Sequence, residues 1–261
     1  MTKFSMKIIP ELLLEEYKKN FPKELEQKFE NLCDAEISND SFSFYTSVAS
    51  VFSSKIEGEE IELNSYVNHK RFGIEFLPDY TRKIDDLYEA YSFAKVNSLN
   101  KKNISEAHKL LGRNIVALAY QGKHRIQNMF ITTDDGKIEY VATIPDLVNE
   151  EMKKFYDDVD YLLNEELSFS EVFYFASLIH LVFVKIHPWN YGNGRSARLL
   201  EKWFLSEKLG EKAWFIQSEK NYYQKHKLYY SNLRTLGLEY EVLDYSSALP
   251  FLEMLPQSLF L

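Results

Sequence analysis

The feature that most constrains the fold is a run of residues, 170 to 186, that contains EVFYFASLIHLVFVKI and is apolar on nearly every side. A surface helix is apolar along one face only, whereas a helix that is apolar all round is enclosed by other parts of the protein. The most apolar part, Phe173 to Ile186, is also shorter than a membrane span needs, and Ser177, His180 and Lys185 interrupt it. We therefore predict a central helix buried within a helical protein, and no membrane partner.

Apolar side chains at helical spacing predict further helices on both sides of this segment. The predicted ranges are 10–36, 41–57, 79–98, 104–119, 146–163, 195–209 and 219–236, with a short helix or loop at 60–70. Between 124 and 142 the pattern changes, because FITT and KIEYV flank Asp134, Asp135 and Gly136. An Asp-Gly pair between two such runs is typical of a β-hairpin. The predicted fold class is mainly α, a helical bundle with one small β-hairpin.

Composition limits the compartment and the partners that the chain suits. The 261 residues carry a formal net charge of −8 and a single cysteine, Cys33. One cysteine excludes an internal disulfide and a cysteine-rich zinc site, which fits a reducing, cytoplasmic location. The acidic balance argues against nucleic acid as the main partner, although one local pocket can still be basic and bind a nucleotide.

The segment that carries chemistry, HPWNYGNGRSAR, follows the buried helix directly. Pro188 disfavours helical geometry at His187, so this histidine is expected at the end of a rigid helix. The turn Gly192–Gly194 runs into the next helix and offers unpaired backbone N–H groups at the positive end of the helix dipole. Arg195 and Arg198 are three residues apart and therefore neighbour each other on that helix. Together these groups suit a polyphosphate better than a lone carboxylate.

This segment resembles the motif of the Fic (Fido) family, His-Pro-Phe-x-Asp/Glu-Gly-Asn-Gly-Arg-x-x-Arg. The fixed positions that match are His187, Pro188, Gly192, Asn193, Gly194, Arg195 and Arg198. GKHRIQNMFI is similar to the family's strand leading into a flap hairpin, and ISEAHKLLG resembles its opening helix. The resemblance implies a Fic core at residues 100–240, with an N-terminal helical region at 1–99 and a C-terminal tail at 241–261 packed on the core.

Fic proteins mostly move AMP from ATP onto a Ser, Thr or Tyr hydroxyl of a protein. The resemblance implies that His187 deprotonates the target hydroxyl and that the Gly192–Gly194 loop holds the phosphates. It also implies that Arg198 binds the γ-phosphate while Arg195 supports the phosphate site, and Tyr223 is our choice for a ring beside adenine. The expected partners are ATP and a hydroxyl-bearing target protein, which could be the chain itself. The hairpin is expected to act as a flap that pairs with the target's backbone.

Tyr191 departs from the family motif, which has an acidic residue at this position. In the family that carboxylate binds a Mg²⁺ ion bridging two phosphates, and a neutral phenol is a poor ligand for this ion. We therefore expect no metal ligand among the site residues, and Mg²⁺ at most as an ion recruited through phosphates and water. Slow transfer, a phosphotransferase using another donor, and a nucleotide-binding regulatory pseudoenzyme stay open as alternatives.

Upstream, Ser53 and Glu57 lie in SSKIEG, which resembles the family's inhibitory motif, Ser/Thr-x-x-x-Glu-Gly/Asn. Four residues apart on a helix, they share one face, and Gly58 could end that helix. In the family this glutamate pairs with the last motif arginine, here Arg198, and occupies the place of the γ-phosphate. The resemblance implies autoinhibition by a helix at about residues 41–58, since one guanidinium cannot bind a carboxylate and a phosphate in the same space. A capping box or an ordinary surface glutamate is the alternative structural interpretation.

Overall fold

The computed structural model describes residues 5–39, 42–132 and 138–261, in which the chain is mainly α-helical with one two-stranded antiparallel sheet. The α-helices are α1 (Leu14–Asn20), α2 (Leu25–Glu30), α3 (Phe44–Ile56), α4 (Leu63–Phe72), α5 (Pro78–Lys95), α6 (Lys101–Leu111), α7 (Pro145–Asn164), α8 (Phe169–Ile186), α9 (Asn193–Leu209), α10 (Ser218–Gln224), α11 (His226–Arg234), α12 (Leu249–Leu252) and α13 (Met254–Gln257). The strands are β1 (Phe130–Thr132) and β2 (Ile138–Val141), and the 3₁₀ turns are η1 (Leu118–Tyr120), η2 (Glu211–Phe215), η3 (Tyr240–Val242), η4 (Tyr245–Ser247) and η5 (Ser258–Phe260). The predicted fold class is confirmed.

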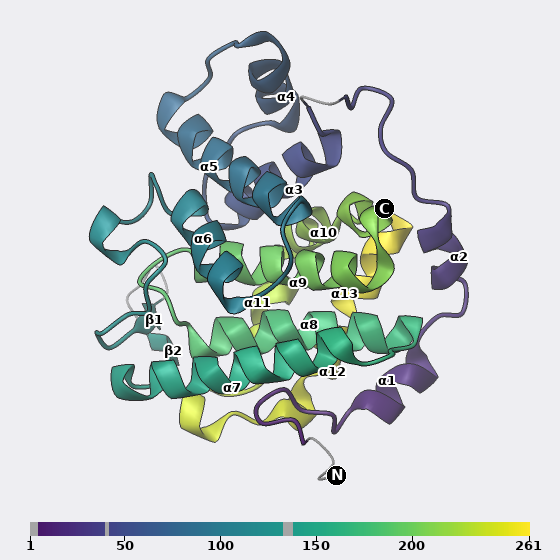
Figure 1. Ribbon diagram of the computed structural model, residues 1–261, viewed down its shortest axis with the longest axis vertical. Helices are drawn as coiled ribbons and strands as arrows, with labels where there is room; N and C mark the ends of the chain where they lie inside the picture. The colour runs from purple at the N-terminus through teal and green to yellow at the C-terminus, as the bar shows by residue number, and fades with distance from the viewer. Residues whose placement is uncertain (1–4, 40–41, 133–137) are drawn as a thin grey trace.

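Helix α8 lies at the centre of the molecule, with α7 on one side and α9 on the other (Figure 1). Its start is set by a capping box. The side chain of Ser168 accepts from the backbone N–H of Glu171, and the side chain of Glu171 accepts from the backbone N–H of Ser168. Every residue from 172 to 183 is buried, because α7, α9 and the C-terminal helices cover all its faces. The prediction of an enclosed central helix is therefore confirmed.

The length of α8 corrects one step of the sequence reasoning. The helix begins at Phe169, so its 18 residues and mean hydropathy of 1.6 make it long and apolar enough to cross a membrane by length and composition. In the structure, 78% of these 18 residues are buried inside the protein. A core helix meets the same two criteria, and burial accounts for the composition of α8.

The N-terminal segment differs from the single helix predicted at 10–36. Two short helices, α1 and α2, form there, and the chain between them is extended at Phe21, with φ −70° and ψ 120°. Pro22 explains the break, because proline has no N–H to donate and disfavours helical geometry in the residue before it.

Helix α6 is shorter than the predicted range of 104–119. It ends at Leu111, and Gly112 begins a series of tight turns. The carboxylate of Asp86 on α5 accepts hydrogen bonds from the backbone N–H of Asn114 at 3.0 Å and from its side-chain amide at 2.7 Å. A tertiary acceptor thus takes the N–H that a longer helix would have used, which local periodicity does not reveal.

The hairpin is attached to the core through its inner strand. Strand β2 pairs with β1, and the N–H of Val141 also donates to the carbonyl of Leu238 at 2.8 Å. The hydroxyl of Tyr140 donates to the carbonyl of Lys185 at 2.7 Å, which ties β2 to the end of α8. The predicted turn at Asp134, Asp135 and Gly136 lies outside the described residues.

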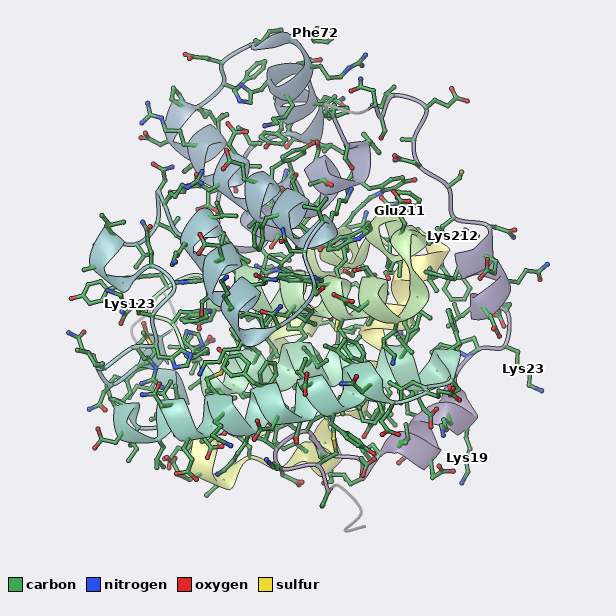
Figure 2. The ribbon with its side chains drawn as sticks, in the orientation of Figure 1. Lys19, Lys23, Phe72, Lys123, Glu211 and Lys212 are labelled. Atoms are coloured by element: carbon green, nitrogen blue, oxygen red, sulfur yellow. The ribbon has the colours of Figure 1, made fainter. Side chains whose placement is uncertain are left out.

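Helix α4 and the first turns of α5 form an outer unit at the top of Figure 1, whereas the rest of α5 packs on α3, α6 and α9. Phe72 lies at the tip of this unit and points away from the central helices (Figure 2).

On the side of α2, the ammonium of Lys212 contacts the carboxylate of Glu30 at 2.8 Å, joining η2 to the N-terminal segment (Figure 2). One buried apolar cluster runs from Ile9 to Leu259 and includes residues of all three predicted regions, whose boundaries stay a prediction.

Candidate functional site

His187 lies at the end of α8 in a strained backbone conformation. Its φ of 54° and ψ of 58° place a non-glycine residue in the left-handed region, which costs on the order of 1–3 kcal/mol. Ring atom Nδ1 lies 3.2 Å from the carbonyl of Val184. A carbonyl can only accept, so Nδ1 carries the proton and Nε2 of the neutral ring keeps a lone pair. Burial lowers the pKa of His187 to about 4, which keeps the ring neutral at pH 7.

The loop after His187 is closed by its own side chains. The side-chain amide of Asn193 accepts from the N–H of Trp189 and donates to its carbonyl, both at 2.8 Å. These two bonds hold the Asn193 side chain within the loop. Helix α9 begins at Asn193 after Gly192, and the N–H groups of its first turn have no acceptor within the helix.

Two residues from outside the motif support this loop. Arg125 is fully buried, and its guanidinium donates to the carbonyls of His187, Gln127 and Thr143. His108 on α6 contacts the Tyr191 carbonyl through Nε2 at 3.0 Å and accepts from a backbone N–H through Nδ1. The loop geometry therefore depends on the hairpin base and on α6 as well as on the motif.

Arg198 is enclosed by α3 and α11. Its Nε donates to the hydroxyl of Ser53 at 2.8 Å, and its Nη2 donates to the Ser53 carbonyl at 3.1 Å and to Oε1 of Glu57 at 2.6 Å. The Arg198 side chain is 1% exposed and that of Glu57 is 28% exposed. Burial alone would raise the pKa of Glu57, but Arg198 and then Arg195 outweigh it, so the pKa lies below the ordinary value of 4.5. The predicted contact between Glu57 and Arg198 is thus present.

The Glu57 carboxylate lies against the start of α9. A Cβ placed on Gly194 would come within 2.6 Å of Oε1 of Glu57 and 3.1 Å of Nη1 of Arg198. Only glycine at 194 leaves room for an anion this close to the helix N-terminus, where the dipole favours negative charge. The carboxylate therefore occupies an anion-binding position between Gly194 and Arg198.

Arg195 is placed differently from Arg198. It points to Glu59, just beyond α3, and the two side chains form a buried ion pair. Lys83 on α5 approaches the other oxygen of Glu59 at 3.4 Å. Arg195 does not line the cavity described next, so the structure does not bring it together with His187.

A cavity of about 330 Å³ joins these groups, and its size and mostly apolar lining suit a small-molecule ligand. It is lined at one end by Glu57, His187, Arg198 and the Gly192–Gly194 loop, and elsewhere by strands β1 and β2, Lys185 and α11. The tyrosines that line it are Tyr140, Tyr191, Tyr229 and Tyr230. Tyr223 is not among them, because its ring packs on Phe52 and under Lys55 on α3. The ring chosen from sequence to flank adenine thus lies outside the cavity.

A buried hydrogen-bond chain runs behind Arg198. Nη1 of Arg198 donates to the hydroxyl of Tyr229 at 3.4 Å, and that hydroxyl lies 2.9 Å from Nε2 of His180. Nδ1 of His180 lies 2.7 Å from Glu201, which also accepts from the hydroxyl of Tyr222 at 2.8 Å. The Glu201 carboxylate can only accept, so Nδ1 of His180 carries a proton, and the Tyr229 hydroxyl accepts from Arg198 beside Nε2. His180 is therefore a satisfied core residue that holds Arg198 in place through Tyr229.

The donors in the cavity do not fit a protein-bound Mg²⁺ ion. Tyr191 is 64% exposed and holds the position that is acidic in the motif. The two carboxylates that line the cavity, Glu57 and Glu139, are each paired with an arginine, Arg198 and Arg234. Mg²⁺ prefers carboxylate and phosphate oxygens, and no uncommitted carboxylate lines the cavity among residues 5–39, 42–132 and 138–261.

The fold and the site together define a class of helical protein. In this class, an anion-binding turn lies at the start of a buried helix, and a histidine lies beside that turn. Residues 98–205 match the model of the Fic/DOC family. The match confirms the resemblance drawn from the motif. It supports a Fic-type enzyme or regulator. No curated protein matches the chain.

Solved structures of similar fold come from bacteria and an animal. A Fic family protein from Desulfovibrio desulfuricans G20 is 20% identical, with a TM-score of 0.69 over 98% of this chain and 73% of its own. A Fic domain containing signaling protein from Bacteroides thetaiotaomicron VPI-5482 is 16% identical, with a TM-score of 0.63 over 96% of this chain and 93% of its own. Fic-1 (aa134–508) from C. elegans is 16% identical, with a TM-score of 0.67 over 95% of this chain and 71% of its own. At these identities the likeness shows the fold alone.

Sequence reasoning missed several residues that shape the site. Arg125, His108 and Glu59 act through contacts with chain that is distant in sequence, and no local pattern marks them. Lys185 did carry a signal, since it is a charge within an otherwise apolar helix. The catalytic, phosphate-binding and inhibitory roles assigned to the motif residues stay predictions.

Proposed function

We propose that the chain is a Fic-type nucleotidyltransferase that moves AMP from ATP to a protein hydroxyl, and that Glu57 holds it off by pairing with Arg198. The observation that carries this proposal is the position of the Glu57 carboxylate between Gly194 and Arg198, in the same cavity as His187. A carboxylate there marks where a phosphate would bind.

In the proposed reaction, Nε2 of His187 takes the proton of the target hydroxyl, whose oxygen attacks the α-phosphorus of ATP. The bond between the α-phosphorus and the bridging oxygen breaks, and pyrophosphate leaves. The backbone N–H groups of the Gly192–Gly194 turn and the guanidinium of Arg198 stabilise the negative charge, so the protein mainly positions groups. The ring of His187 is neutral at pH 7, which suits a proton acceptor.

The partner that this function requires is a cytoplasmic protein with a Ser, Thr or Tyr hydroxyl, or a second copy of the chain. Among the described residues, β1 pairs only with β2, so its outer edge is available to the backbone of an extended peptide. Phe130 at that edge is exposed and lines the cavity, which would bring a bound segment close to His187.

The test is intact-mass analysis of the Glu57→Gly protein with ATP, GTP, CTP and UTP, each with and without Mg²⁺ or Mn²⁺. We expect a mass increase of one AMP with ATP, larger than in the unmodified sequence, because Arg198 becomes free to bind phosphate. His187→Ala in the same background should abolish the increase and leave ATP binding largely intact. Unchanged modification in that variant would remove His187 as the base.

A second function, a nucleotide-binding regulatory pseudoenzyme, is favoured by Tyr191. The cavity would bind nucleotide, but without a carboxylate for the metal the transfer step would be lost. Binding of ATP by the Glu57→Gly protein with no mass increase under any divalent-ion condition would select this function.

A further inference from the structure

Lys185 lies on the last turn of α8 and is one of the residues that line the cavity. Its side chain is buried, with the residue only 4% exposed. Its Nζ lies 4.1 Å from the centre of the Tyr140 ring, and the hydroxyl of Tyr140 donates to the Lys185 carbonyl. Strand β2 therefore fixes the lysine along the cavity wall.

The other buried cations of the described chain all have polar partners. Arg195 and Arg198 pair with Glu59 and Glu57, and Lys202 pairs with Glu219 at 2.6 Å. Arg125 donates to backbone carbonyls. Lys185 differs, since within residues 5–39, 42–132 and 138–261 its ammonium has the Tyr140 ring and no hydrogen-bond acceptor or carboxylate.

A buried ammonium without an anion is unfavourable, because desolvation is not repaid by a partner. Burial lowers the pKa of Lys185 to about 8, so the group still carries its charge at pH 7. A cation that is kept charged, faces a cavity and lacks a partner is arranged to receive an anionic ligand. The carboxylates in the cavity lining, Glu57 and Glu139, are paired with arginines.

We propose that Lys185 binds a phosphate oxygen of the nucleotide and supplies positive charge that a Mg²⁺-binding carboxylate would otherwise recruit. This role rests on the proposed function, because it assumes that the cavity takes a nucleotide. The phosphate-binding role of Lys185 explains both the poor fit of the site to Mg²⁺ and the presence of an unpaired buried lysine. Nucleotide binding by this chain is then independent of divalent ions.

The experiment measures ATP affinity by calorimetry, using the 261-residue Glu57→Gly protein so that Arg198 is free. Titrations are run in excess chelator and in Mg²⁺, without any target protein. Lys185→Met and Lys185→Arg are compared in this background. Lys153→Met, at an exposed position on α7, is the control for loss of one positive charge.

We expect chelator and Mg²⁺ to give affinities within a few-fold of each other. Lys185→Met should weaken ATP binding in chelator by at least about 10-fold, the usual value of one hydrogen bond to a charged group, and Lys185→Arg should recover most of it. The melting temperature of Lys185→Met should not fall, since methionine removes a buried charge. A lower melting temperature with unchanged affinity would assign Lys185 a structural role and overturn the proposal.

The remaining outcomes separate the two proposals. Tight binding only in Mg²⁺, or equal binding by Lys185→Met, overturns the role of Lys185 while AMP transfer can still stand. Equal binding would also be the result if the lysine served an acidic group of the target instead of the nucleotide. Lysine-dependent binding without any mass increase supports the role of Lys185 and contradicts AMP transfer. No binding of nucleotide at all overturns both.

Discussion

At the scale of single residues, the site depends on the protonation states of two buried groups that line one cavity. Burial lowers the pKa of His187 to about 4 and that of Lys185 to about 8. Between these values the histidine is neutral and the lysine is charged. A neutral imidazole and a charged ammonium are therefore present together at physiological pH.

These two values predict the pH profile of AMP transfer by the Glu57→Gly protein. Activity should persist as the pH falls from 7 to about 5 and decline only near pH 4, because the base is lost on protonation. Above about pH 8 the apparent affinity for ATP should weaken, because Lys185 loses its proton. Single-turnover rates across pH 4 to 10 check both limbs. A decline centred near 6.5, the ordinary histidine value, would contradict the buried environment of His187.

Tyr191 supplies a second prediction at this scale. Tyr191→Asp should increase Mg²⁺-dependent transfer, because it restores a carboxylate at the motif's acidic position. The rate is measured against Mg²⁺ concentration in the Glu57→Gly background, with Tyr191→Phe as the control for loss of the phenol. Equal Mg²⁺ dependence in Asp and Phe variants would show that this position is not a metal site in the chain.

At the scale of elements, helix α3 serves both the core and the proposed inhibition. Its inner side is buried against α5 and α10, so the helix cannot leave without unfolding part of the core. Glu57 is the C-cap residue that follows Ile56 at the end of α3, and its side chain is partly exposed. Release is therefore expected through movement of the Glu57 side chain, with α3 in place.

The two glutamates after α3 should differ in their effect on stability. Glu59→Gln removes the charge partner of buried Arg195, and breaking such a pair costs about 3–5 kcal/mol of unfolding free energy. Glu57→Gly should cost less, since the Glu57 carboxylate is partly open to water and Arg198 keeps its hydrogen bonds to Ser53. Urea unfolding of both variants measures the difference. A larger loss for Glu57→Gly would mean that Glu57 is mainly structural.

The junction of hairpin and motif gives the next prediction. Arg125→Met removes a buried donor from three carbonyls, of which that of Thr143 is buried, and should cost about 3–5 kcal/mol of unfolding free energy. Lys123→Met, on an exposed neighbour, should change stability by less than about 0.5 kcal/mol. Thermal and urea unfolding of both variants provide the comparison, and equal stabilities would contradict the supporting role of Arg125.

At the scale of the whole molecule, residues from all parts of the chain converge on one loop. His108 stacks on Trp189 with ring centres 4.3 Å apart, and it contacts the backbone at both ring nitrogens. One nitrogen donates and the other accepts, so the fold requires the neutral ring. Burial accordingly lowers the pKa of His108 to about 4.

Neutral His108 and His187 predict an acid-sensitive fold. Both folded pKa values lie below the ordinary 6.5, so the unfolded chain binds more protons below pH 6.5 and stability falls as the pH drops towards 4. His108 alone should contribute a loss on the order of 2–3 kcal/mol over that range. Urea unfolding at pH 7 and pH 4.5 measures it. His108→Gln should be less stable at pH 7 but show a smaller loss on acidification, and an unchanged loss would contradict this assignment.

Most of the fold could be predicted from sequence where the signal is local. The enclosed helix α8, the hairpin and the start of α9 follow from apolar spacing, an Asp-Gly pair and a Gly-Asn-Gly turn. Pro22 marks the break between α1 and α2 in the sequence, although apolar periodicity continues across it. The early end of α6 could not be predicted, because the acceptor that ends it, Asp86, lies on another helix.

The sequence by itself determined the family motif and the placing of a histidine, a glycine turn and two arginines at one helix junction, because those relations are set by residues adjacent in the chain. Only the tertiary structure decided that Arg195 pairs with Glu59 away from the cavity, and that α11 contributes Tyr229 while Tyr223 packs elsewhere. These outcomes depend on the packing of helices distant in sequence, and the burial that keeps Lys185 unpaired arises only when they assemble.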